Sequence, residues 1–240
     1  MSPEPPLLVV ADLVKRFGGF RALDGVSFHL APGEVLGLVG PNGSGKTTCI
    51  NVISGLYPPD GGRVSYLGHS IGGVASHVLA RRGINRTFQS PKPFLSLTVR
   101  ENVLVAATYG NAGVAPDLDA LLASVELDTL AERPAGELNS AQQKTLDLAR
   151  ALATSPRVLL VDELAAGLNP AELGRMADRL RALAAGGMAL LVVEHLMGFI
   201  DRVTDRVAVM NAGREFFEGT LAAAIKDPEV IRVFLGGAHD

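Results

Sequence analysis

The feature that most constrains the fold of this chain is an eight-residue stretch, residues 40–47, which reads Gly-Pro-Asn-Gly-Ser-Gly-Lys-Thr. It matches the pattern G-x-x-x-x-G-K-[ST], directly follows the apolar run Val35–Val39, and opens a helical stretch from Thr48 toward Leu56. Such a loop turns successive backbone N–H groups inward, and the helix N-terminus adds partial positive charge. A glycine-rich turn that binds nothing is the alternative. The strand, the full match and the helix together favour a loop that binds the phosphates of a nucleoside triphosphate.

The residue types in this loop have separate expected tasks. Lys46 is long enough to reach the outer phosphates, and the Thr47 hydroxyl can ligate Mg²⁺. A nucleoside triphosphate and a magnesium ion are therefore the two cofactors that we expect. The other nucleotide contacts predicted from the loop and the first helical turn are Gly40, Asn42, Gly43, Ser44, Gly45 and Thr48.

The amino-acid composition limits the kinds of molecule that the chain is expected to bind. The chain has 240 residues, enough for one large domain, and a formal net charge of −3, so no general surface for polyanions is implied. Tryptophan is absent and aromatic residues are 5% of the sequence, which disfavours platforms for base stacking. We therefore expect no nucleic-acid partner. Cys49 is the single cysteine, so neither an intrachain disulfide nor a thiol-rich metal site can form, and we expect a small buried apolar group there.

The apolar residues occur in short runs, such as Val158–Val161 and Met188–Val193. None approaches the roughly 18 consecutive apolar residues that a transmembrane helix needs. The first residues, Met1–Pro6, lack the basic and apolar regions of a secretory signal, and we expect them to form a short disordered tail. These features indicate a soluble, cytoplasmic chain.

Apolar, β-rich runs alternate with helical patterns through much of the chain, which predicts an α/β fold with a mostly parallel sheet. The runs at Val35, Val158 and Ala189 are almost continuously apolar, as expected for central strands covered on both faces. Runs near residues 26–29 and 64–67 are flanked by turn residues and are more typical of an antiparallel patch. The predicted strands are Leu7–Ala11, Val26–Leu30, Val35–Val39, Val64–Leu67, Ile84–Phe88, Val158–Val161, Ala189–Val193 and Arg206–Met210, and the predicted helices between them are Thr48–Leu56, Pro170–Ala185 and Leu196–Val203.

Between residues 98 and 154 the strand-like runs stop and helical patterns replace them. We interpret residues 98–154 as a helical subdomain inserted into an α/β core of residues 1–97 and 155–240, within a single domain that spans residues 1–240. The helices predicted in the inserted segment are Val99–Thr108, Leu118–Val125 and Ala141–Ala153.

Three further segments lie outside these helices and strands. Gly110–Pro116 is expected to be a loop tip. A hairpin is expected at Val207–Glu218, with its turn at Asn211-Ala212-Gly213 and short helices after it. The segment Gly68–Gly83 has no assignment.

Two carboxylates, Asp162 and Glu163, directly follow the apolar run Val158–Val161. A carboxylate at the C-terminal end of that strand can hold Mg²⁺ beside a phosphate loop, which is the role predicted for Asp162. Glu163 is placed to orient and deprotonate a water for attack on the γ-phosphate. An ordinary acidic turn after a buried strand is the alternative, and the phosphate loop upstream makes the catalytic interpretation preferable.

His195 follows the predicted strand Ala189–Val193, and Gln89 follows Arg86-Thr87-Phe88. The His195 imidazole is placed to contact the γ-phosphate and report its presence, and the Gln89 amide to complete the shell of magnesium and water. Such side chains at strand ends are more often polar caps or solvated, so both assignments depend on the phosphate loop. The predicted catalytic group is Glu163, His195, Gln89 and Lys46, and the predicted metal ligands are Thr47, Gln89 and Asp162.

The sequence Leu138-Asn139-Ser140-Ala141-Gln142-Gln143 precedes a helical stretch rich in Leu and Ala. Asn139 or Ser140 is a suitable N-cap, and Gln142 or Gln143 can close a capping box. The exposed N-terminus of the same helix can also bind a phosphate, which a second molecule would present. Ser140, Ala141 and Gln142 are accordingly included among the predicted nucleotide contacts.

In this order, the motifs resemble those of the nucleotide-binding subunits of ATP-binding-cassette (ABC) transporters, and the resemblance spans nearly the whole chain. It implies that the nucleotide is ATP and that the chain is an ATPase with Glu163 as its base. It also implies that Phe17, ahead of the phosphate loop, stacks on adenine, although a hydrophobic residue at the rim is the alternative. The matching elements are the phosphate loop at Gly40–Thr47, a Q-loop at Gln89, a signature at Leu138–Gln142, the pair Asp162–Glu163, a D-loop at Ala166–Asn169 and a switch histidine at His195.

Within the family, three stretches resemble the ATPase subunits of branched-chain amino acid importers. They are Arg86–Gln89 with Leu97–Asn102, Ala165–Pro170, and the tail Asp227–Gly236. Relatives of this kind also serve urea, amides and other small polar solutes, so the resemblance leaves the cargo open. The implied fold is a P-loop NTPase core with an antiparallel β patch and a helical subdomain that carries the signature.

The resemblance also implies partners and a location. Two ATPase subunits, identical or different, would close head to tail over two Mg-ATP, each held between one chain's phosphate loop and the other chain's signature helix. Closure would drive integral membrane permease subunits, which places the chain peripherally on the inner face of the cell membrane. Ser90–Val99, with Pro91, Pro93, Phe94 and Leu95, is the candidate contact with the permease. A loop whose apolar residues fold inward is the alternative.

Two positions depart from the family pattern. Ala141 replaces the signature glycine whose missing side chain permits close backbone approach to the γ-phosphate, and Leu164 replaces the proline that usually follows the catalytic Glu. The first departure motivates the hypothesis that the chain works with a different ATPase partner and that one composite site is hydrolytically weak. The competing functions are a nucleotide-dependent switch that scarcely hydrolyses ATP and a soluble ABC protein of repair or translation. Proteins of the latter kind usually carry tandem cassettes or long coiled-coil insertions, and this sequence shows neither.

Overall fold

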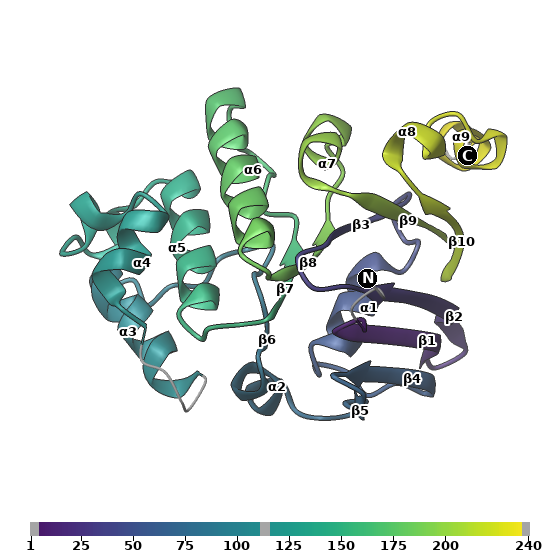
Figure 1. Cartoon of the computed structure of the whole chain (residues 1–240), viewed down its shortest axis with the longest axis horizontal. Helices are drawn as coiled ribbons and strands as arrows, with labels where there is room; N and C mark the ends of the chain where they lie inside the picture. Colours follow the sequence, from purple (N-terminus) through teal and green to yellow (C-terminus); the bar gives the residue numbers. More distant parts are fainter. Residues whose placement is uncertain (1–4, 111–115, 237–240) are drawn as a thin grey trace.

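A mostly parallel sheet of six strands runs through the centre of the molecule (Figure 1). The computed structural model describes residues 5–110 and 116–236. The strand order is β10-β9-β3-β8-β7-β6, and among these described strands β10 alone runs antiparallel to its neighbour. The predicted parallel core is confirmed, although β6 ends at Arg86 rather than at Phe88. The strands are β3 (Val35–Val39), β6 (Ile84–Arg86), β7 (Val158–Asp162), β8 (Ala189–Val193), β9 (Arg206–Asn211) and β10 (Arg214–Gly219).

The two faces of this sheet are buried in different hydrophobic clusters, which explains the continuous apolar runs. In β7, Leu159 and Val161 belong to one cluster, whereas Val158 and Leu160 belong to the other. Side chains alternate between the faces of a strand, so a strand that is apolar at every position needs cover on both sides. Helices α6 (Pro170–Ala185) and α7 (Met197–Val203) cover the first face, and α1 (Lys46–Ile53) with a second sheet covers the other.

The second sheet is antiparallel, with the strand order β2-β1-β4-β5, and lies beside α1 (Figure 1). The predicted antiparallel patch is confirmed, but the first strand was predicted too short: it runs on to Phe17 instead of ending at Ala11, and turns at Gly18 into β2. Polar residues such as Asp12 and Arg16 interrupt the apolar pattern there, which hid the extension. The strands are β1 (Leu8–Phe17), β2 (Phe20–Leu30), β4 (Gly61–Tyr66) and β5 (His69–Ser70).

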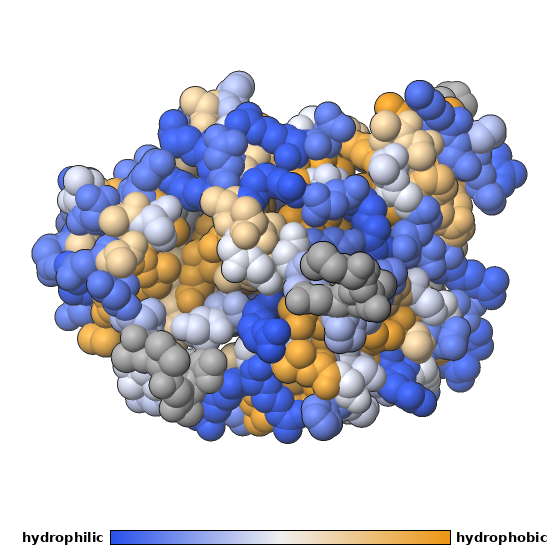
Figure 2. Space-filling view, viewed as in Figure 1, coloured by the Kyte–Doolittle hydropathy of each residue, from blue (hydrophilic) through white to orange (hydrophobic). Residues whose placement is uncertain are grey.

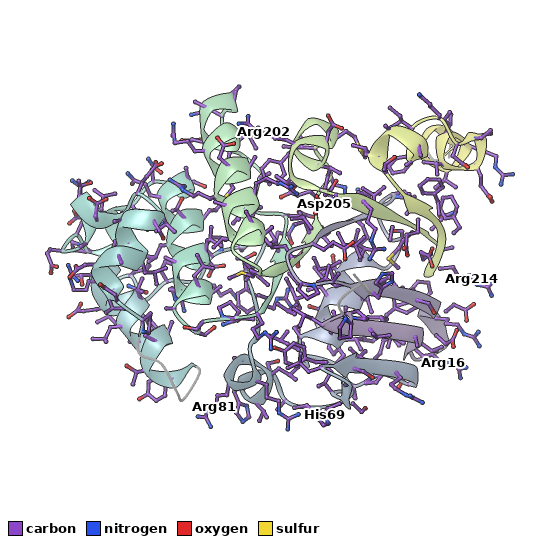
Figure 3. All side chains as sticks on the ribbon, viewed as in Figure 1. Arg16, His69, Arg81, Arg202, Asp205 and Arg214 are labelled. Carbon is purple, nitrogen blue, oxygen red and sulfur yellow. The ribbon has the colours of Figure 1, made fainter. Side chains whose placement is uncertain are left out.

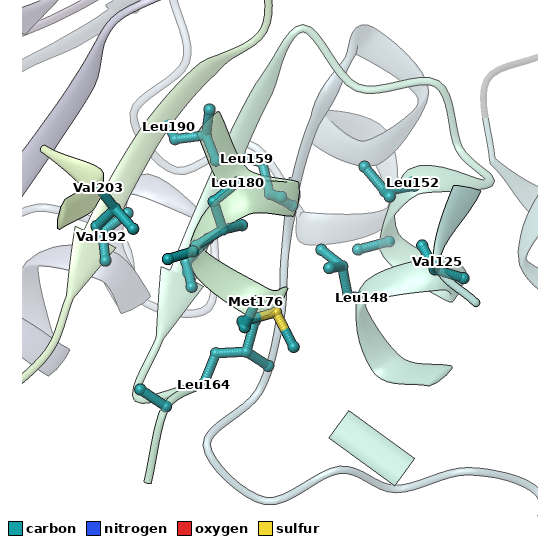
Figure 4. Packing of buried hydrophobic residues seen from close by; sticks show 14 of the residues in the cluster. Val125, Leu148, Leu152, Leu159, Leu164, Met176, Leu180, Leu190, Val192 and Val203 are labelled. Carbon is teal, nitrogen blue, oxygen red and sulfur yellow. The ribbon is translucent and has the colours of Figure 1, made fainter. Parts of the chain in front are cut away.

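The helices between residues 98 and 154 gather on the side of the molecule away from the antiparallel sheet (Figure 1, teal). They are α3 (Val99–Tyr109), α4 (Leu118–Ser124) and α5 (Ser140–Leu152), with 3₁₀ turns η1 (Asp128–Leu130) and η2 (Ala135–Glu137). Leu148 of α5 shares a hydrophobic cluster with Leu159 of β7 and Leu180 of α6 (Figure 4). The helical content is as predicted, whereas the subdomain boundaries stay a prediction. Most of the predicted loop tip, residues 111–115, lies outside the described residues.

The segment Gly68–Gly83, which had no assignment, contains β5 and α2 (Ser76–Arg82). Gly83 ends α2 in the left-handed conformation, with φ 97°. The segment buries Ile71 and Leu79 but few other apolar side chains. Its apolar pattern is therefore too sparse to reveal a helix from sequence.

The C-terminal part contains the predicted hairpin of β9 and β10. Ala212 and Gly213, between the two strands, both have positive φ, 46° and 80°, as the tight turns of hairpins require. The predicted short helices follow as α8 (Leu221–Ala224) and α9 (Pro228–Gly236). The predicted N-terminal tail lies mostly outside the described residues, which begin at Pro5.

The face shown in Figure 2 has polar and apolar areas interspersed, and charged side chains such as Arg16, Arg81 and Arg214 lie at the periphery (Figure 3). Within the part of the chain that the structure describes, no helix is both long and apolar enough to cross a bilayer. Cys49 is buried, and burial raises the pKa of its thiol to about 12. It is therefore the small buried apolar group that its position predicted.

Candidate functional site

Four adjacent parallel strands end at the same edge of the central sheet, and each leads into one of the predicted functional segments. β3 leads into the phosphate loop, β8 toward His195, β7 into Glu163, and β6 toward Gln89. In the register between β7 and β8, Asp162 lies opposite Val193. The carboxyl ends of adjacent parallel strands form one crevice, so segments far apart in sequence become neighbours there.

The phosphate loop is a curl of backbone held from inside by the Lys46 ammonium. Lys46 Nζ donates to the carbonyl oxygens of Gly40 (2.8 Å) and Pro41 (2.9 Å) and lies 3.4 Å from Ser44 Oγ. Burial lowers the pKa of Lys46, while the carboxylates at residues 162 and 163 act in the opposite direction. The ammonium is thus near the acidic pair as well as inside the loop.

The backbone at the start of α1 is shaped to receive a ligand. Gly45 occupies the N-cap with φ 108°, and among residues 5–110 and 116–236 no side chain caps this helix. The backbone N–H groups at an uncapped helix start have no intrahelical partner, so phosphate oxygens can accept hydrogen bonds from them. A Cβ at Gly40, whose φ is 150°, would lie 2.2 Å from the carbonyl oxygen of Met210, so glycine is required there. Of the other predicted contacts, Asn42, Gly43 and Thr47 are exposed, Thr48 is half-buried and Ser44 is buried.

Asp162, the predicted metal ligand, is 2% exposed and forms an ion pair with Arg86, with 3.1 Å between Oδ2 and Nη2. The Arg86 guanidinium also donates to Asn51 Oδ1 (2.7 Å) and Ser54 Oγ (3.1 Å) and lies over the ring of Phe88. Burial raises the pKa of Asp162, and the charge of Arg86 opposes that rise. Arg86 therefore favours the ionised form of a buried carboxylate, a role that the sequence analysis did not assign.

Glu163 is held between two other predicted residues. Gln89 Nε2 donates to Glu163 Oε2 (2.5 Å), and His195 Nε2 lies 3.0 Å from Glu163 Oε1. The donor of this contact depends on the tautomer of His195, and a His195 tautomer protonated at Nε2 would donate to the carboxylate. Glu163 has φ 48°, which is uncommon for a residue other than glycine. The structure thus brings Gln89, Glu163 and His195 together beyond the ends of β6, β7 and β8.

The donor groups beside the phosphate loop fit Mg²⁺. Thr47 offers a hydroxyl, Asp162 a carboxylate and Gln89 an amide oxygen, and hard oxygen ligands are those that magnesium prefers. The ion pair with Arg86 uses Oδ2 of Asp162, and the contact from Gln89 to Glu163 uses the amide nitrogen. Asp162 Oδ1 and the Gln89 amide oxygen are therefore the atoms suited to a metal. The metal-binding role of these residues stays a prediction.

Phe17 ends β1 and is 43% exposed. Its ring packs edge-on against Tyr57, with 5.2 Å between centroids and an interplanar angle of 80°. Lys15 Nζ lies 5.5 Å from the same ring. Phe17 is thus partly accessible to solvent although Tyr57 and Lys15 contact its ring, and its stacking on adenine stays a prediction.

Helix α5 begins at the signature with a complete capping box. Asn139 Oδ1 accepts from the Gln142 N–H (2.9 Å), and Gln142 Oε1 accepts from the Asn139 N–H (3.0 Å). Of the capping alternatives, Asn139 with Gln142 is the one that the structure has. Ser140 is exposed and Ala141 is half-buried. The contact of Ser140, Ala141 and Gln142 with a nucleotide stays a prediction.

Lys144 of α5 and Glu194 before His195 are among the buried charges near the site that the sequence analysis missed. Burial lowers the pKa of Lys144 and raises the pKa of Glu194 to about 7. Glu194 follows five apolar residues of β8 directly, and a carboxylate at that place is the signal that could have found it. Lys144 has no such signal, because its burial arises only when α5 packs on the loop after β7.

Known proteins resemble this chain along nearly its whole length. Residues 23–166 match the sequence profile of the family described as ABC transporter. The chain is 37% identical to the high-affinity branched-chain amino acid transport ATP-binding protein BraF of Pseudomonas aeruginosa, over 97% of the chain and 99% of that protein. It is 35% identical to the high-affinity branched-chain amino acid transport ATP-binding protein LivG of Escherichia coli, with the same two coverages, 97% and 99%.

Solved structures share the fold along nearly the whole chain. A nucleotide-free ATP-binding cassette from an ABC transporter has a TM-score of 0.87 and 33% identity, covering 96% of the chain and 99% of that structure. The ADP conformation of such a cassette has the same TM-score, 0.87, and identity, 33%, with coverages of 97% and 99%. These neighbours confirm the predicted P-loop ATPase fold. With its phosphate loop and acidic pair at one sheet edge, the chain belongs to the ABC transporter family, as one of its ATP-binding and ATP-hydrolysing subunits.

Proposed function

We propose that this chain energises an ABC importer of branched-chain or other small amino acids. The cargo is supported by BraF and LivG, whose names assign them to branched-chain amino acid transport and which match the chain along nearly their entire length. An importer of urea or amides is the alternative for the cargo. The proposed role of the chain is the same in both cases: it is the subunit that couples ATP hydrolysis to movement of its partner subunits.

The observation that carries the proposed catalysis is the arrangement around Glu163. Its two carboxylate oxygens contact Gln89 and His195, and its negative charge interacts electrostatically with Lys46 of the phosphate loop. An ionised carboxylate has about four acceptor positions, so two contacts leave room for a water. Glu163 is the residue that orients the attacking water and takes up its proton. His195 fixes the carboxylate and stands where it can contact the γ-phosphate.

Lys46 and the loop amides neutralise the charge of the nucleotide. The Lys46 ammonium bonds neutral carbonyl groups of Gly40 and Pro41, and charged phosphate oxygens are stronger acceptors. A triphosphate would therefore draw the ammonium out of the loop toward itself. The amides at the start of α1 take further negative charge. When bound, Mg²⁺ would be held by Thr47, Asp162 and Gln89 and would neutralise phosphate charge.

The partners that we propose are integral membrane permease subunits and a second ATPase subunit arranged head to tail, at the inner face of the cell membrane. Phe94 and Leu95 are 49% and 59% exposed, which favours the docking interpretation of Ser90–Val99 over an inward-folded loop. The segment is nevertheless fixed, because the buried Asn102 amide accepts from the Phe94 N–H (2.8 Å) and donates to the Phe94 carbonyl (3.0 Å). An ordered, exposed apolar segment is a suitable surface for a protein partner.

Replacement of Glu163 by glutamine tests the ATPase assignment. The amide keeps the shape of the side chain but cannot take up a proton, so turnover of the assembled complex should fall by about 100-fold or more. Nucleotide binding should be retained, because the phosphate loop is unchanged. The exposed Glu229→Gln provides the matched control and should hydrolyse ATP like the wild type. Equal turnover of wild type and Glu163→Gln would contradict the assignment.

The cargo is tested with the complex of this chain and its permease subunits in proteoliposomes. We expect ATP-dependent uptake of labelled leucine, isoleucine or valine. Uptake of urea or acetamide without uptake of these amino acids would show that the alternative cargo is the correct one.

One observation favours a second candidate, a nucleotide-dependent switch with weak ATPase activity. The signature carries Ala141 where the family pattern has glycine, and the capping box of Asn139 and Gln142 already occupies donors at that helix start. Both features weaken the contact that this signature offers to a γ-phosphate. The same comparison of wild type with Glu163→Gln decides between the two candidates.

A further inference from the structure

The loop after β7, residues 163–169, is held by a buried cation from the signature helix. Lys144 Nζ donates to the carbonyl oxygens of Leu164 (3.1 Å) and Ala166 and lies 3.4 Å from the carbonyl oxygen of Glu163. The Lys144 side chain is 6% exposed. An ammonium group has three donors and no acceptor, so three carbonyl groups can satisfy it completely. The carbonyls of this loop are thereby tied to α5.

A buried carboxylate accepts a hydrogen bond from an amide of the same loop. Glu194 Oε1 accepts from the Ala165 N–H at 2.6 Å, and Glu194 is 2% exposed. Glu194 stands between β8 and His195, so the amide of the loop is tied to the segment that carries a partner of the Glu163 carboxylate. Charged groups at such depth are costly unless their hydrogen bonds are made. We call this pair of side chains, Lys144 and Glu194, the loop clasp.

The backbone of Glu163 explains why the loop needs such a clasp. Its φ of 48° lies in a region that residues other than glycine seldom adopt, and such a conformation persists only where the surroundings enforce it. On its N-terminal side, the Glu163 N–H donates to the Val193 carbonyl (2.9 Å). On its C-terminal side, the Glu163 carbonyl faces Lys144. Lys144 therefore orients the peptide group that follows the proposed base.

Apolar packing cannot supply the same constraint. Leu164 and Ala165 are buried in the hydrophobic cluster that includes Met176 (Figure 4). Hydrophobic contacts are not directional, so they fix where the loop lies but not which way its carbonyl groups point. That orientation depends on the loop clasp.

Lys144 also has a particular place on its helix. It lies three residues after Ala141, which is close to one helical turn. In the proposed function, the start of α5 faces the nucleotide held by the second subunit. A single side chain therefore joins the signature that serves one nucleotide site to the base that serves the other.

We propose that Lys144 is a positioning residue for ATP hydrolysis. Through its contacts with the loop, it couples the position of the signature helix α5 to the orientation of the Glu163 carboxylate. Glu194 completes the clasp by accepting from the Ala165 N–H of the same loop. The proposal rests on the proposed function, because that function gives Glu163 its catalytic task and α5 its second nucleotide. Lys144 itself acts through the loop rather than on the nucleotide.

The test compares Lys144→Met with Lys144→Arg in the full chain assembled with its partners. Methionine matches the length of the lysine but cannot bond the carbonyls, so kcat should fall about tenfold or more. The KM for ATP should change less than about threefold, and ATP binding by the full chain should stay as in the wild type. Arginine keeps the charge and the donors and should restore at least a third of wild-type kcat. Lys226→Met, at an exposed lysine, should change neither quantity.

The Glu163→Gln background separates positioning from a general structural role. If Lys144 acts through Glu163, then Lys144→Met should lower the residual turnover of Glu163→Gln by less than twofold. The same fold loss in both backgrounds would overturn the proposal, and so would wild-type kcat in Lys144→Met. If the methionine variant does not fold, Lys144→Gln, which keeps two donors, is measured instead, with a smaller kcat loss expected and the same contradicting results.

The proposed function and the clasp fail in different ways. If wild type and Glu163→Gln hydrolyse ATP equally, the proposed catalysis fails and the clasp fails with it. If these two differ while Lys144→Met matches the wild type, the clasp alone is wrong.

Discussion

The two helix starts that face nucleotides in the proposed function, those of α1 and α5, are built in opposite ways. At α1 the N-cap is Gly45, and within the described ranges no side chain caps it. At α5 Asn139 and Gln142 cap one another. A helix start with unpaired amides is completed by a ligand, whereas a capped start is stable by itself. The phosphate loop is therefore arranged to bind a ligand, while the start of the signature helix is capped without one.

The side chains that connect the two helices to the acidic residues after β7 differ as well. The end of α1 is tied to the acidic pair through Arg86, which bonds Asn51, Ser54 and Asp162. Helix α5 is tied to the loop after β7 through Lys144. The first support acts on the predicted metal ligand, and the second acts on the proposed base.

The largest expected effect comes from breaking the support of α1. Arg86→Met leaves the buried Asp162 without its partner, so the free energy of unfolding should fall by about 3–5 kcal/mol at pH 7. Denaturant unfolding followed by circular dichroism measures it. The matched control is Arg202→Met, because Arg202 (labelled in Figure 3) pairs with Asp178 at the surface with a separation of 2.7 Å. That variant should lose no more than about 1 kcal/mol, and equal losses in the two variants would refute the comparison.

The next effect concerns pH and the clasp beside α5. The pKa of Glu194 rises from 4.5 to about 7 in the folded chain, because burial penalises its charged form. A folded state that holds this proton more tightly than the unfolded state is stabilised below pH 4.5, and loses that stability as pH rises toward 7. At about 1.4 kcal/mol per pKa unit, the loss is on the order of 3 kcal/mol.

The variant that isolates this contribution is Glu194→Gln, which keeps an oxygen for the Ala165 N–H but does not titrate. As pH rises from 4.5 to 7, the free energy of unfolding of Glu194→Gln should increase relative to that of the wild type. A constant difference between the two proteins over that range would show that Glu194 does not titrate as its burial implies.

The smallest effect concerns the signature itself. Ala141→Gly removes the methyl group that limits approach of a phosphate, so turnover of the assembled complex should rise severalfold. Glycine in the first turn should also cost about 0.5–1 kcal/mol of stability. Ala185→Gly, at the exposed end of α6, should show a similar cost in stability without the gain in turnover. Unchanged turnover in Ala141→Gly would make the two helix starts functionally equivalent and remove the hypothesis of a weak composite site.

Sequence patterns were sufficient for features that depend on neighbours along the chain. The phosphate loop, the strands Val35–Val39 and Ala189–Val193, and the capping box at the start of α5 each carry a local signal, although the structure was needed to choose Asn139 and Gln142 among the capping alternatives. Gln89, Glu163 and His195 were each named from their positions after apolar runs, but their mutual contacts were seen only in the structure.

Features that depend on which distant side chains meet could not be predicted. Arg86 and Asp162 are 76 residues apart, and the sequence does not show that a guanidinium fills the space between β7 and α1. Lys144 looks like any polar residue of an amphipathic helix until its helix packs on the loop. The extension of β1 to Phe17 depends on pairing with β2, which outweighs the polar residues in that stretch.

Calorimetric titration of the folded chain with Mg-ATP tests whether the backbone amides of the loop that begins at residue 40 bind the phosphates of ATP. The wild type should bind with measurable heat at one site per chain, and Lys46→Met should bind at least tenfold more weakly. Absence of binding by folded wild-type protein, or equal affinity of the two proteins, would contradict the account.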